Sequence, residues 1–374
     1  MSDIERVLVT GGAGFIGSHL ADALLAKGYK VRALDNLSEQ VHSGRREFPA
    51  YLDPEVEPFE ADIREPRNVQ RALQGVDAVF HFASAVGVGQ SMYEVEKYVD
   101  INNRGTAVLL EALRRRPVAK LIVASSMSVY GEGLYRDSEG AMCAPRPRST
   151  QQLKEGRWDL VDARGARLEP VPTPEEKVPM PESIYALSKY DQEKMCLLFG
   201  RAYNIAAAAL RFFNVYGERQ ALSNPYTGVL AIFAARYLNG RAPVIFEDGL
   251  QRRDFVHVRD LVAGCVLALE NPMARDDVFN LGGGAANSVF EIAKRLGKVL
   301  GKEHLEPQVC GSYRAGDIRN CFADISKASR VLGYRPQITL EKGLTALAQW
   351  LEGRIDEDRS EVADSELRRH GLVA

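Results

Sequence analysis

The sequence predicts an α/β protein built on a doubly wound parallel sheet. Two observations predict this fold. Short apolar runs alternate with amphipathic stretches over residues 6–125, which is the pattern of parallel strands joined by covering helices. A glycine-rich turn follows the first apolar run directly, as in a strand that leads into a helix. The chain has 374 residues, of which 45% are hydrophobic, so it has enough apolar material for a large core.

The expected elements follow the apolar pattern in chain order. Residues 6–10 form the first strand, residues 15–27 a helix that ends before Gly28, and residues 31–34 the next strand. Further strands are expected at 77–82 and 120–124. The basic run at 114–116 indicates the last turn of a helix, where cations suit the helix dipole. A helix to about residue 203, a strand at 206–212 and a helix around 229–238 follow, with smaller elements to about residue 352.

Two segments depart from this pattern. Residues 132–181 are rich in proline, arginine and glutamate and show no periodicity, so we expect an inserted surface excursion before the helix that carries Tyr185. The highly charged tail, residues 352–374, is expected to be a helical or loose surface segment.

Composition argues against several classes of function. A net charge of −2 disfavours nucleic acid or an anionic membrane as the main partner. No apolar run approaches the length of a membrane span, and acidic residues at the start disfavour a signal peptide. The five cysteines are scattered without metal-ligand spacing, which favours a reduced compartment and predicts no metal site. We therefore expect a cytoplasmic protein.

The segment TGGAGFIG at residues 10–17 is a dinucleotide-binding fingerprint, because it joins a strand to a helix. Gly11 permits the tight turn, Gly14 lets the backbone approach a pyrophosphate, and Gly17 allows the helix to pack closely on the strand. Amide groups at the helix N-terminus can then bind the phosphates. Asp35, at the end of the next strand, would accept hydrogen bonds from a ribose diol and repel a 2′-phosphate, which predicts NAD. The alternative role for Asp35 is a loop cap.

Tyr185 and Lys189 are one helical turn apart and project from the same face of a helix. A free tyrosine has a pKa of about 10. A lysine beside it favours the phenolate, which makes the tyrosine usable as an acid and base. Ser126 follows a strand, so it faces the ligand crevice and can donate to a developing oxyanion. Taken alone, these residues fit equally an ordinary tyrosine, a solvated lysine and a turn-forming serine.

Taken together, the glycine fingerprint, Asp35, SSMSVYG at 125–131 and YALSK at 185–189 resemble the extended short-chain dehydrogenase/reductase superfamily, in its nucleotide-sugar epimerase/dehydratase branch. The resemblance runs from about residue 7 to residue 334. It implies a Rossmann domain at 1–204 and a smaller C-terminal α/β substrate-binding lobe at 205–374, from which the chain crosses back to the Rossmann sheet. It also implies tightly held NAD, a nucleotide-diphosphate sugar as substrate, and a homodimer formed by helices near 92–115 and 182–203.

The resemblance also assigns roles to individual residues. It implies that Ser126, Tyr185 and Lys189 are catalytic. The implied cofactor contacts are Gly11, Gly14, Phe15, Ile16, Gly17, Asp35, Asn36, Asp62, Ile63, Phe82, Ala83, Ser84, Asn102, Tyr185, Lys189 and Val215. The implied substrate contacts are Val86, Ser126, Asn214, Val229, Phe246, Arg253, Arg314, Asp317 and Cys321. A guanidinium suits a diphosphate because its planar fork pairs two oxygens, although outside this context such arginines more often form surface ion pairs. His81, His257 and Tyr130 are expected to pack rather than react.

The residues after Ser126 discriminate between reactions of this branch. Related dehydratases carry an Asp-Glu pair there, and decarboxylating relatives carry a glutamate close by, whereas this chain has Met127 and Ser128. Because neither can transfer protons in that way, elimination and decarboxylation are disfavoured. Hydride removal and return remains, and we expect Tyr185 to take the proton of a sugar 4-hydroxyl while NAD takes the hydride, through a transient 4-keto sugar.

Within the branch, the segment 219–228 and the proline-rich excursion are similar to dTDP-L-rhamnose 4-epimerases. Val86 stands where galactose-type 4-epimerases have a lysine, and Cys321 where some have a tyrosine, which weakens a simple UDP-galactose assignment. The alternatives are a UDP-glucose or UDP-glucuronate 4-epimerase, a nucleotide-sugar 4-ketoreductase, and a non-catalytic NAD-binding sensor. The intact Ser126, Tyr185 and Lys189 argue against the sensor.

Overall fold

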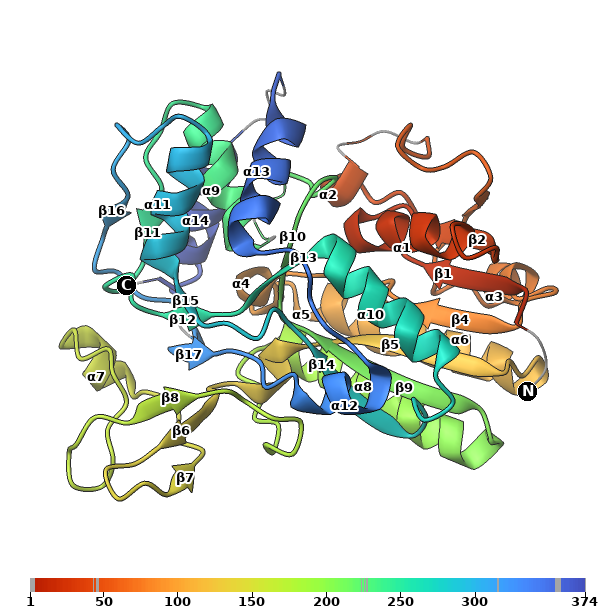
Figure 1. Ribbon diagram of the computed structural model, residues 1–374, viewed down its shortest axis with the longest axis horizontal. Coiled ribbons are helices and arrows are strands. Elements are labelled where there is room, and N and C mark those ends of the chain that lie inside the picture. The colour runs from red at the N-terminus through yellow and green to blue at the C-terminus, as the bar shows by residue number, and fades with distance from the viewer. Residues whose placement is uncertain are drawn as a thin grey trace.

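A parallel sheet of seven strands forms the centre of the molecule in the computed structural model (Figure 1). The structure describes residues 4–42, 44, 47–222, 224, 226, 228–314, 316–353 and 358–373. The strand order is β14-β9-β5-β4-β1-β2-β3. The strands are β1 (Arg6–Thr10), β2 (Lys30–Asp35), β3 (Glu57–Glu60), β4 (Ala78–His81), β5 (Lys120–Ser126), β9 (Ala206–Phe212) and β14 (Asp277–Leu281). Because the chain runs from β1 toward one edge and then from β4 toward the other, the predicted doubly wound Rossmann-type fold is confirmed.

Helices cover both faces of this sheet (Figure 1). Side chains alternate along each strand, so that Val7 and Val9 of β1 enter one core and Leu8 enters the other. The first core is covered by α1 (Phe15–Leu25), α10 (Val258–Glu270) and α12 (Ser326–Leu332). The second is covered by α3 (Pro66–Ala72), α6 (Gly105–Arg115) and α8 (Ile184–Tyr203). Of the helices in the described part of the chain, none is long and apolar enough to cross a membrane.

Most expected boundaries agree with the structure. The strand β9 and the helix α9 (Val229–Leu238) begin and end at the expected residues, and the basic run lies at the end of α6. Helix α1 ends at Leu25 rather than at residue 27. The strand β3 was not expected, because Pro58 and two glutamates interrupt its apolar pattern, as is typical of an edge strand.

The C-terminal part of the chain builds a smaller lobe. Helices α9, α11 (Val289–Val299) and α13 (Leu340–Leu351) enclose a third core that contains Phe233, Ile292 and Leu344. Its strand pairs are β10 (Asn214–Tyr216) with β13 (Phe255–His257), β11 (Val244–Ile245) with β16 (Gln308–Val309), and β12 (Arg252–Arg253) with β15 (Asn287–Ser288) and β17 (Asn320–Cys321). Shorter helices of the chain are α2 (Glu39–His42), α4 (Val88–Ser91), α5 (Val95–Tyr98), a π-helix (Val99–Arg104) and a 3₁₀-helix (Met127–Tyr130).

The excursion at 132–181 differs from the sequence-based expectation, because it contains regular structure. Strand β6 (Leu134–Arg136) pairs antiparallel with both β7 (Met142–Cys143) and β8 (Glu169–Val171), and α7 (Thr150–Lys154) follows β7. A small core of Tyr135, Leu160 and Leu168 lies beneath them. Strands of two or three residues are too short to show periodicity, which is why the sequence indicated none.

A buried ion pair joins β9 to α8. Arg211 donates to the two carboxylate oxygens of Glu193 from Nη2 and Nε, at 2.7 and 2.9 Å. The exposed fractions of the two side chains are only 3% and 0%. Glu193 also accepts a hydrogen bond of 2.8 Å from Ser125 Oγ. This ion pair therefore fixes the end of β5, whose last residue is Ser126.

We expect Arg211→Met to lower the free energy of unfolding by about 3–5 kcal/mol, because Glu193 is left buried without its partner. The double variant Arg211→Met/Glu193→Leu should lose less, since it leaves no buried charge. Urea unfolding monitored by circular dichroism measures both. Arg201→Met, which removes a half-exposed arginine paired with Asp276, is the control. Equal losses in the single and double variants would contradict the expectation.

Candidate active site

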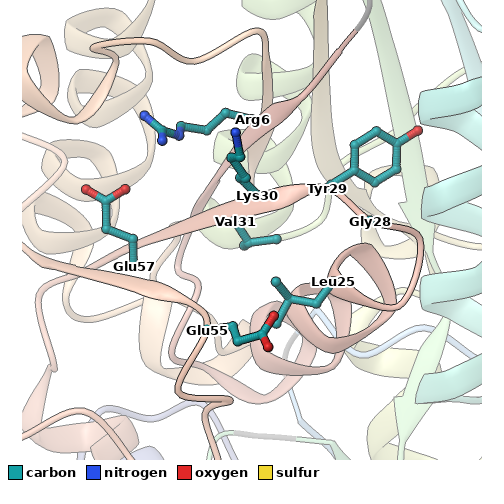
Figure 2. A pocket seen from close by; sticks show the side chains of 8 residues that line it. All are labelled: Arg6, Leu25, Gly28, Tyr29, Lys30, Val31, Glu55 and Glu57. Carbon is teal, nitrogen blue, oxygen red and sulfur yellow. The ribbon is translucent and has the colours of Figure 1, made fainter.

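One cavity of about 1300 Å³ opens at the carboxyl ends of the central strands and continues into the C-terminal lobe. Ligands of doubly wound sheets bind at this edge, where the strand order reverses. Every expected cofactor and substrate residue lines this cavity except Asn102 and Cys321. A smaller depression of about 340 Å³ lies at the opposite, amino end of β1 and β2, where it holds none of the expected site residues (Figure 2).

The glycine turn between β1 and α1 is shaped by close backbone contacts. Gly11 has a φ of +72°, which favours glycine, and its N–H donates to Leu34 O at 2.7 Å. A Cβ at Gly17 would lie 2.1 Å from Gly11 O, so no larger residue fits there. At Gly14, by contrast, the nearest atom to an added Cβ is 3.4 Å away, so this backbone is open toward the cavity. Helix α1 begins at Phe15 and directs its free amides to the same place, which suits a pyrophosphate.

Asp35 caps the turn and also lines the cavity, where its expected contact with a ribose stays a prediction. Its Oδ2 accepts from Ala13 N and its Oδ1 from Leu37 N, each at 3.0 Å. Next to it, Asn36 donates to Asp62 Oδ2 at 3.0 Å. Burial raises the pKa of Asp62, but hydrogen bonds from Arg64 outweigh it and hold this pKa at about 2. The side chains of Asp35 and Asp62 thus both border the cavity.

The loop after β4 is held from below by buried polar side chains. Thr10 Oγ1 accepts from Phe82 N and Ala83 N, both at 3.1 Å. Asn102 lies in the π-helix, where its Oδ1 accepts from Ala85 N at 2.7 Å and its Nδ2 donates to Ser188 Oγ at 2.9 Å. Asn102 therefore positions the loop against α8 without lining the cavity.

Tyr185 and Ser126 meet at the centre of the cavity. Burial raises the pKa of Tyr185, and a hydrogen bond with the Ser126 side chain opposes this rise. The expected lowering by Lys189 does not dominate, because the lysine is itself buried, which lowers its pKa to about 7. Lys189 Nζ donates to Gln192 Oε1 at 2.8 Å. The site thus joins a protonated phenol to a lysine that changes charge near neutral pH.

The three residues expected to pack are buried and hydrogen-bonded. His81 contacts Thr10 Oγ1 through Nδ1 at 2.9 Å and Thr106 Oγ1 through Nε2 at 2.8 Å. His257 accepts from Arg259 N at the start of α10. The hydroxyl of Tyr130 donates to Asn280 Oδ1 at 2.7 Å.

The substrate end of the cavity contains buried polar atoms without a partner among the described residues. These atoms are Asn214 Oδ1 and Arg314 Nε. The Arg314 guanidinium lies 4.1 Å from the centre of the Phe246 ring. Arg253 donates to the carbonyls of Arg319 and Ile318, at 2.9 and 2.6 Å. Because a buried unpaired donor or acceptor is costly, these atoms mark the place of a polar ligand.

Cys321 lies behind the cavity wall rather than in it. Its Sγ faces Thr173 of the excursion, 3.9 Å from the hydroxyl oxygen, and the residue is 1% exposed. Val86 does border the cavity and is 48% exposed. Within the segment 219–228, residues 223, 225 and 227 lie outside the described residues. No group of side chains suited to a metal ion occurs in the part of the chain that the structure describes.

One wall of the cavity comes from the charged tail, which the sequence did not indicate as part of a site. Helix α14 (Ser360–Arg369) lines it with Val362, Ala363 and Leu367 among others. Leu367 fills the space beside Gly89, where an added Cβ would lie 2.8 Å from its Cδ2. Ala363 and Leu367, four residues apart among charges, are the one apolar signal that could have indicated a packed helix face.

The chain matches the model of the NAD dependent epimerase/dehydratase family over residues 7–150 and 164–282. It is also similar to a curated dTDP-L-rhamnose 4-epimerase from Burkholderia thailandensis. The two are 32% identical over 363 residues, which cover 95% of this chain and 97% of the relative.

Two solved structures are similar over nearly the whole chain. The UDP-glucose 4-epimerase of Thermotoga maritima, solved with UDP-glucose, gives a TM-score of 0.76 at 32% identity and covers 94% of this chain and 100% of its own. The UDP-glucose 4-epimerase of Thermus thermophilus in complex with NAD gives a TM-score of 0.74 at 30% identity, and the match covers 93% of this chain and 99% of that chain.

The buried His81 predicts a pH dependence of stability. Burial lowers the pKa of His81 from 6.5 to about 3 in the folded protein. Between these values the unfolded chain binds more protons than the folded one, so stability falls as the pH falls. We expect the free energy of unfolding of His81→Gln to fall less steeply as the pH falls, by up to about 1.4 kcal/mol per pH unit between about pH 6 and 4. Urea unfolding at several pH values measures the slope, with exposed His304→Gln as control. Equal slopes in wild type and His81→Gln would contradict this assignment.

Proposed function

The chain belongs to the NAD dependent epimerase/dehydratase family, and we propose that within this family it is the 4-epimerase of dTDP-L-rhamnose. The family match confirms the expected branch and its cofactor, NAD, and the chain is accordingly an NAD-dependent nucleotide-sugar epimerase. The observation that carries the proposal is that Ser126, Tyr185 and Lys189 line one cavity that runs from the glycine turn to Arg314.

The residues of the first half of the cavity fit NAD. The open backbone at Gly14 suits its pyrophosphate, the carboxylate of Asp35 suits ribose hydroxyls, and Asp62 and Ile63 would contact the adenine. Lys189 lines the same cavity as Tyr185 and would bond the nicotinamide ribose. When bound, NAD accepts a hydride from the sugar and gives it back. The protein's own side chains transfer the proton, stabilise the developing charge and bind the diphosphate.

Tyr185 is the proton carrier in the proposed reaction. Its phenolate oxygen takes the proton of the sugar 4-hydroxyl as carbon 4 loses its hydride, and the resulting phenol gives a proton back when the hydride returns. Ser126 donates a hydrogen bond to the same sugar oxygen and stabilises its developing charge. Because burial raises the pKa of Tyr185, the phenolate needs a positive charge nearby, which Lys189 can supply in its protonated form from one turn along the same helix.

The transient 4-keto sugar must turn over before the hydride returns to its other face. Arg253 and Arg314 suit the diphosphate, so the sugar can rotate about a fixed anchor. Met127 and Ser128 line the cavity next to Ser126, and neither side chain offers an acid or base near neutral pH. The site therefore supports epimerisation over elimination of water.

Assembly as a homodimer is part of the proposal. Leu187 and Leu198 are exposed on α8, at fractions of 46% and 57%, and Val95 and Val99 are exposed near the start of the neighbouring π-helix, at 43% and 45%. Residues 187 and 198 lie on the same side of the helix, with the exposed Lys194 between them, so both leucines can face one partner surface. Sedimentation velocity should show a dimer that Leu187→Glu/Leu198→Glu converts to a monomer. A wild type that sediments as a monomer would refute the proposal.

The substrate proposal is tested by incubating the purified protein with dTDP-L-rhamnose, UDP-glucose and UDP-glucuronate, without added reductant. We expect interconversion of dTDP-L-rhamnose and its C4 epimer, at a kcat/KM at least about tenfold above that for either UDP-sugar. Nuclear magnetic resonance of the products identifies the epimer. Preference for UDP-glucose would favour the second candidate, a UDP-glucose 4-epimerase. Reaction only of a 4-keto sugar with NADH would instead identify a ketoreductase.

In the same assay, Tyr185→Phe should reduce kcat by about 10²–10⁴-fold, because the proton carrier is lost. Bound NAD should be retained, since the variant lacks only one hydroxyl group. Tyr203→Phe on the same helix, where the tyrosine is 47% exposed, is the matched control. Full activity of Tyr185→Phe would refute its role as acid and base.

A further inference from the structure

A cluster of buried charges joins the excursion 132–181 to the C-terminal lobe. Its members from the excursion are Glu132, Arg148 and Asp159, and those from the lobe are Glu247, Asp248 and Arg319. The exposed fractions of the side chains of Arg148, Glu247 and Arg319 are 2%, 2% and 1%. Charges this far from water persist only where each has a partner, so the cluster fixes its members in place.

Arg148 is one of the residues through which the excursion reaches the cavity wall. Its Nη1 lies 2.8 Å from Glu247 Oε1, and its Nη2 donates to the backbone carbonyl of Asp317 at 2.9 Å. Nη1 also donates to Trp158 O at 3.3 Å, within the excursion. One planar guanidinium thus holds two segments of the lobe, at 247 and at 317, at a fixed separation.

These two segments carry the side chains that face the nucleotide end of the cavity. Glu247 follows Phe246, and Asp317 N donates to Arg314 O at 3.3 Å. The guanidinium carbon of Arg314 lies 4.1 Å from the centre of the Phe246 ring. Glu247 also has a φ of +55°, a conformation that residues other than glycine rarely adopt. Its contacts with Arg148 and Arg319 are what hold the backbone there.

Arg319 connects the second expected diphosphate ligand to the same cluster. Its guanidinium lies 3.0 Å from Glu247 and 2.6 Å from Asp248, and its carbonyl accepts from Arg253 Nη1 at 2.9 Å. Arg253 therefore binds the carbonyls of residues 318 and 319, and Arg314 accepts a hydrogen bond from Asp317. Arg148 in turn binds the carbonyl of Asp317. The family match omits residues 151–163, which include part of this support.

We propose that Arg148 is a positioning residue for the nucleotide end of the cavity. It sets the distance between the segment of Phe246 and the segment of Arg314, so the excursion takes part in binding a nucleoside diphosphate without contacting it. This inference rests on the proposed function, because it takes the occupant of that end to be the nucleoside diphosphate of the substrate.

The test compares the purified holoenzyme with three variants. Arg148→Met keeps the stem and removes the fork, Arg148→Lys keeps only the charge, and Arg164→Met removes an arginine of the same excursion that is 72% exposed. Calorimetric titration with dTDP and with UDP measures binding without turnover. We expect Arg148→Met to weaken binding of the preferred nucleoside diphosphate about tenfold or more, the size of one buried charged hydrogen bond.

Three further readouts separate positioning from mere stability. Arg148→Lys should bind with intermediate affinity, and Arg164→Met should bind as the wild type does. Bound NAD, measured by absorbance after denaturation, should stay unchanged in all variants. In the epimerase assay, KM for the nucleotide sugar should rise more than kcat falls.

Two outcomes would overturn the inference. Wild-type affinity for dTDP and UDP in Arg148→Met would show that the cluster only stabilises the fold, whatever the change in melting temperature. If Arg148→Met does not fold, wild-type affinity of Arg148→Lys for dTDP and UDP would show equally that the cluster only stabilises the fold. Failure of the wild type to bind either dTDP or UDP would refute the nucleotide-sugar substrate as well, so the two failures are distinguishable.

Discussion

The contact between Gly17 and the carbonyl of Gly11 is the constraint on which the rest of the site depends. Without a side chain at Gly17, helix α1 lies close against the end of β1, and its free amides point into the cavity. Asp35 then locks the turn through the amide of Ala13. Tyr51 adds a hydrogen bond of 2.9 Å to the carbonyl of the same alanine. The geometry of the backbone, rather than any reactive side chain, therefore shapes the end of the cavity that is expected to bind the cofactor.

The buried polar groups around the cavity fall into two kinds. Thr10, Asn102 and Glu193 find all their partners within the protein, and they hold the loops and strand ends that carry the reacting groups. Asn214 Oδ1 and Arg314 Nε have no partner among the described residues. Protein interiors rarely leave such groups unpaired. Around this cavity, the polar groups that have partners therefore identify the supporting structure, and those that lack partners identify a surface that can receive a ligand.

Sequence reasoning could predict most of the central sheet, because its strands are long enough for periodicity and its glycine turn has one steric solution. The family resemblance, rather than the strand pattern, supplied most of the expected residues that line the cavity. Sequence reasoning could not predict the sheet of the excursion, whose strands are very short, or the packing of α14, whose sequence is mostly charged. It could not predict that Cys321 is buried outside the cavity, because the direction of its side chain depends on the local pairing of β17, which no motif reveals.

The π-helical turn Val99–Arg104 makes chain length, as well as the identity of Asn102, a sensitive property of its segment. A π-turn accommodates one more residue than an α-turn, so deleting a single residue there would restore α-helical winding and rotate Asn102 away from the loop that it supports. The spacing between Asn102 and the start of α6 at Gly105 should therefore be invariant in lineages that keep this site, even where the side chains between them vary. Insertions and deletions, which are usually ignored when residues are compared, are the informative changes here.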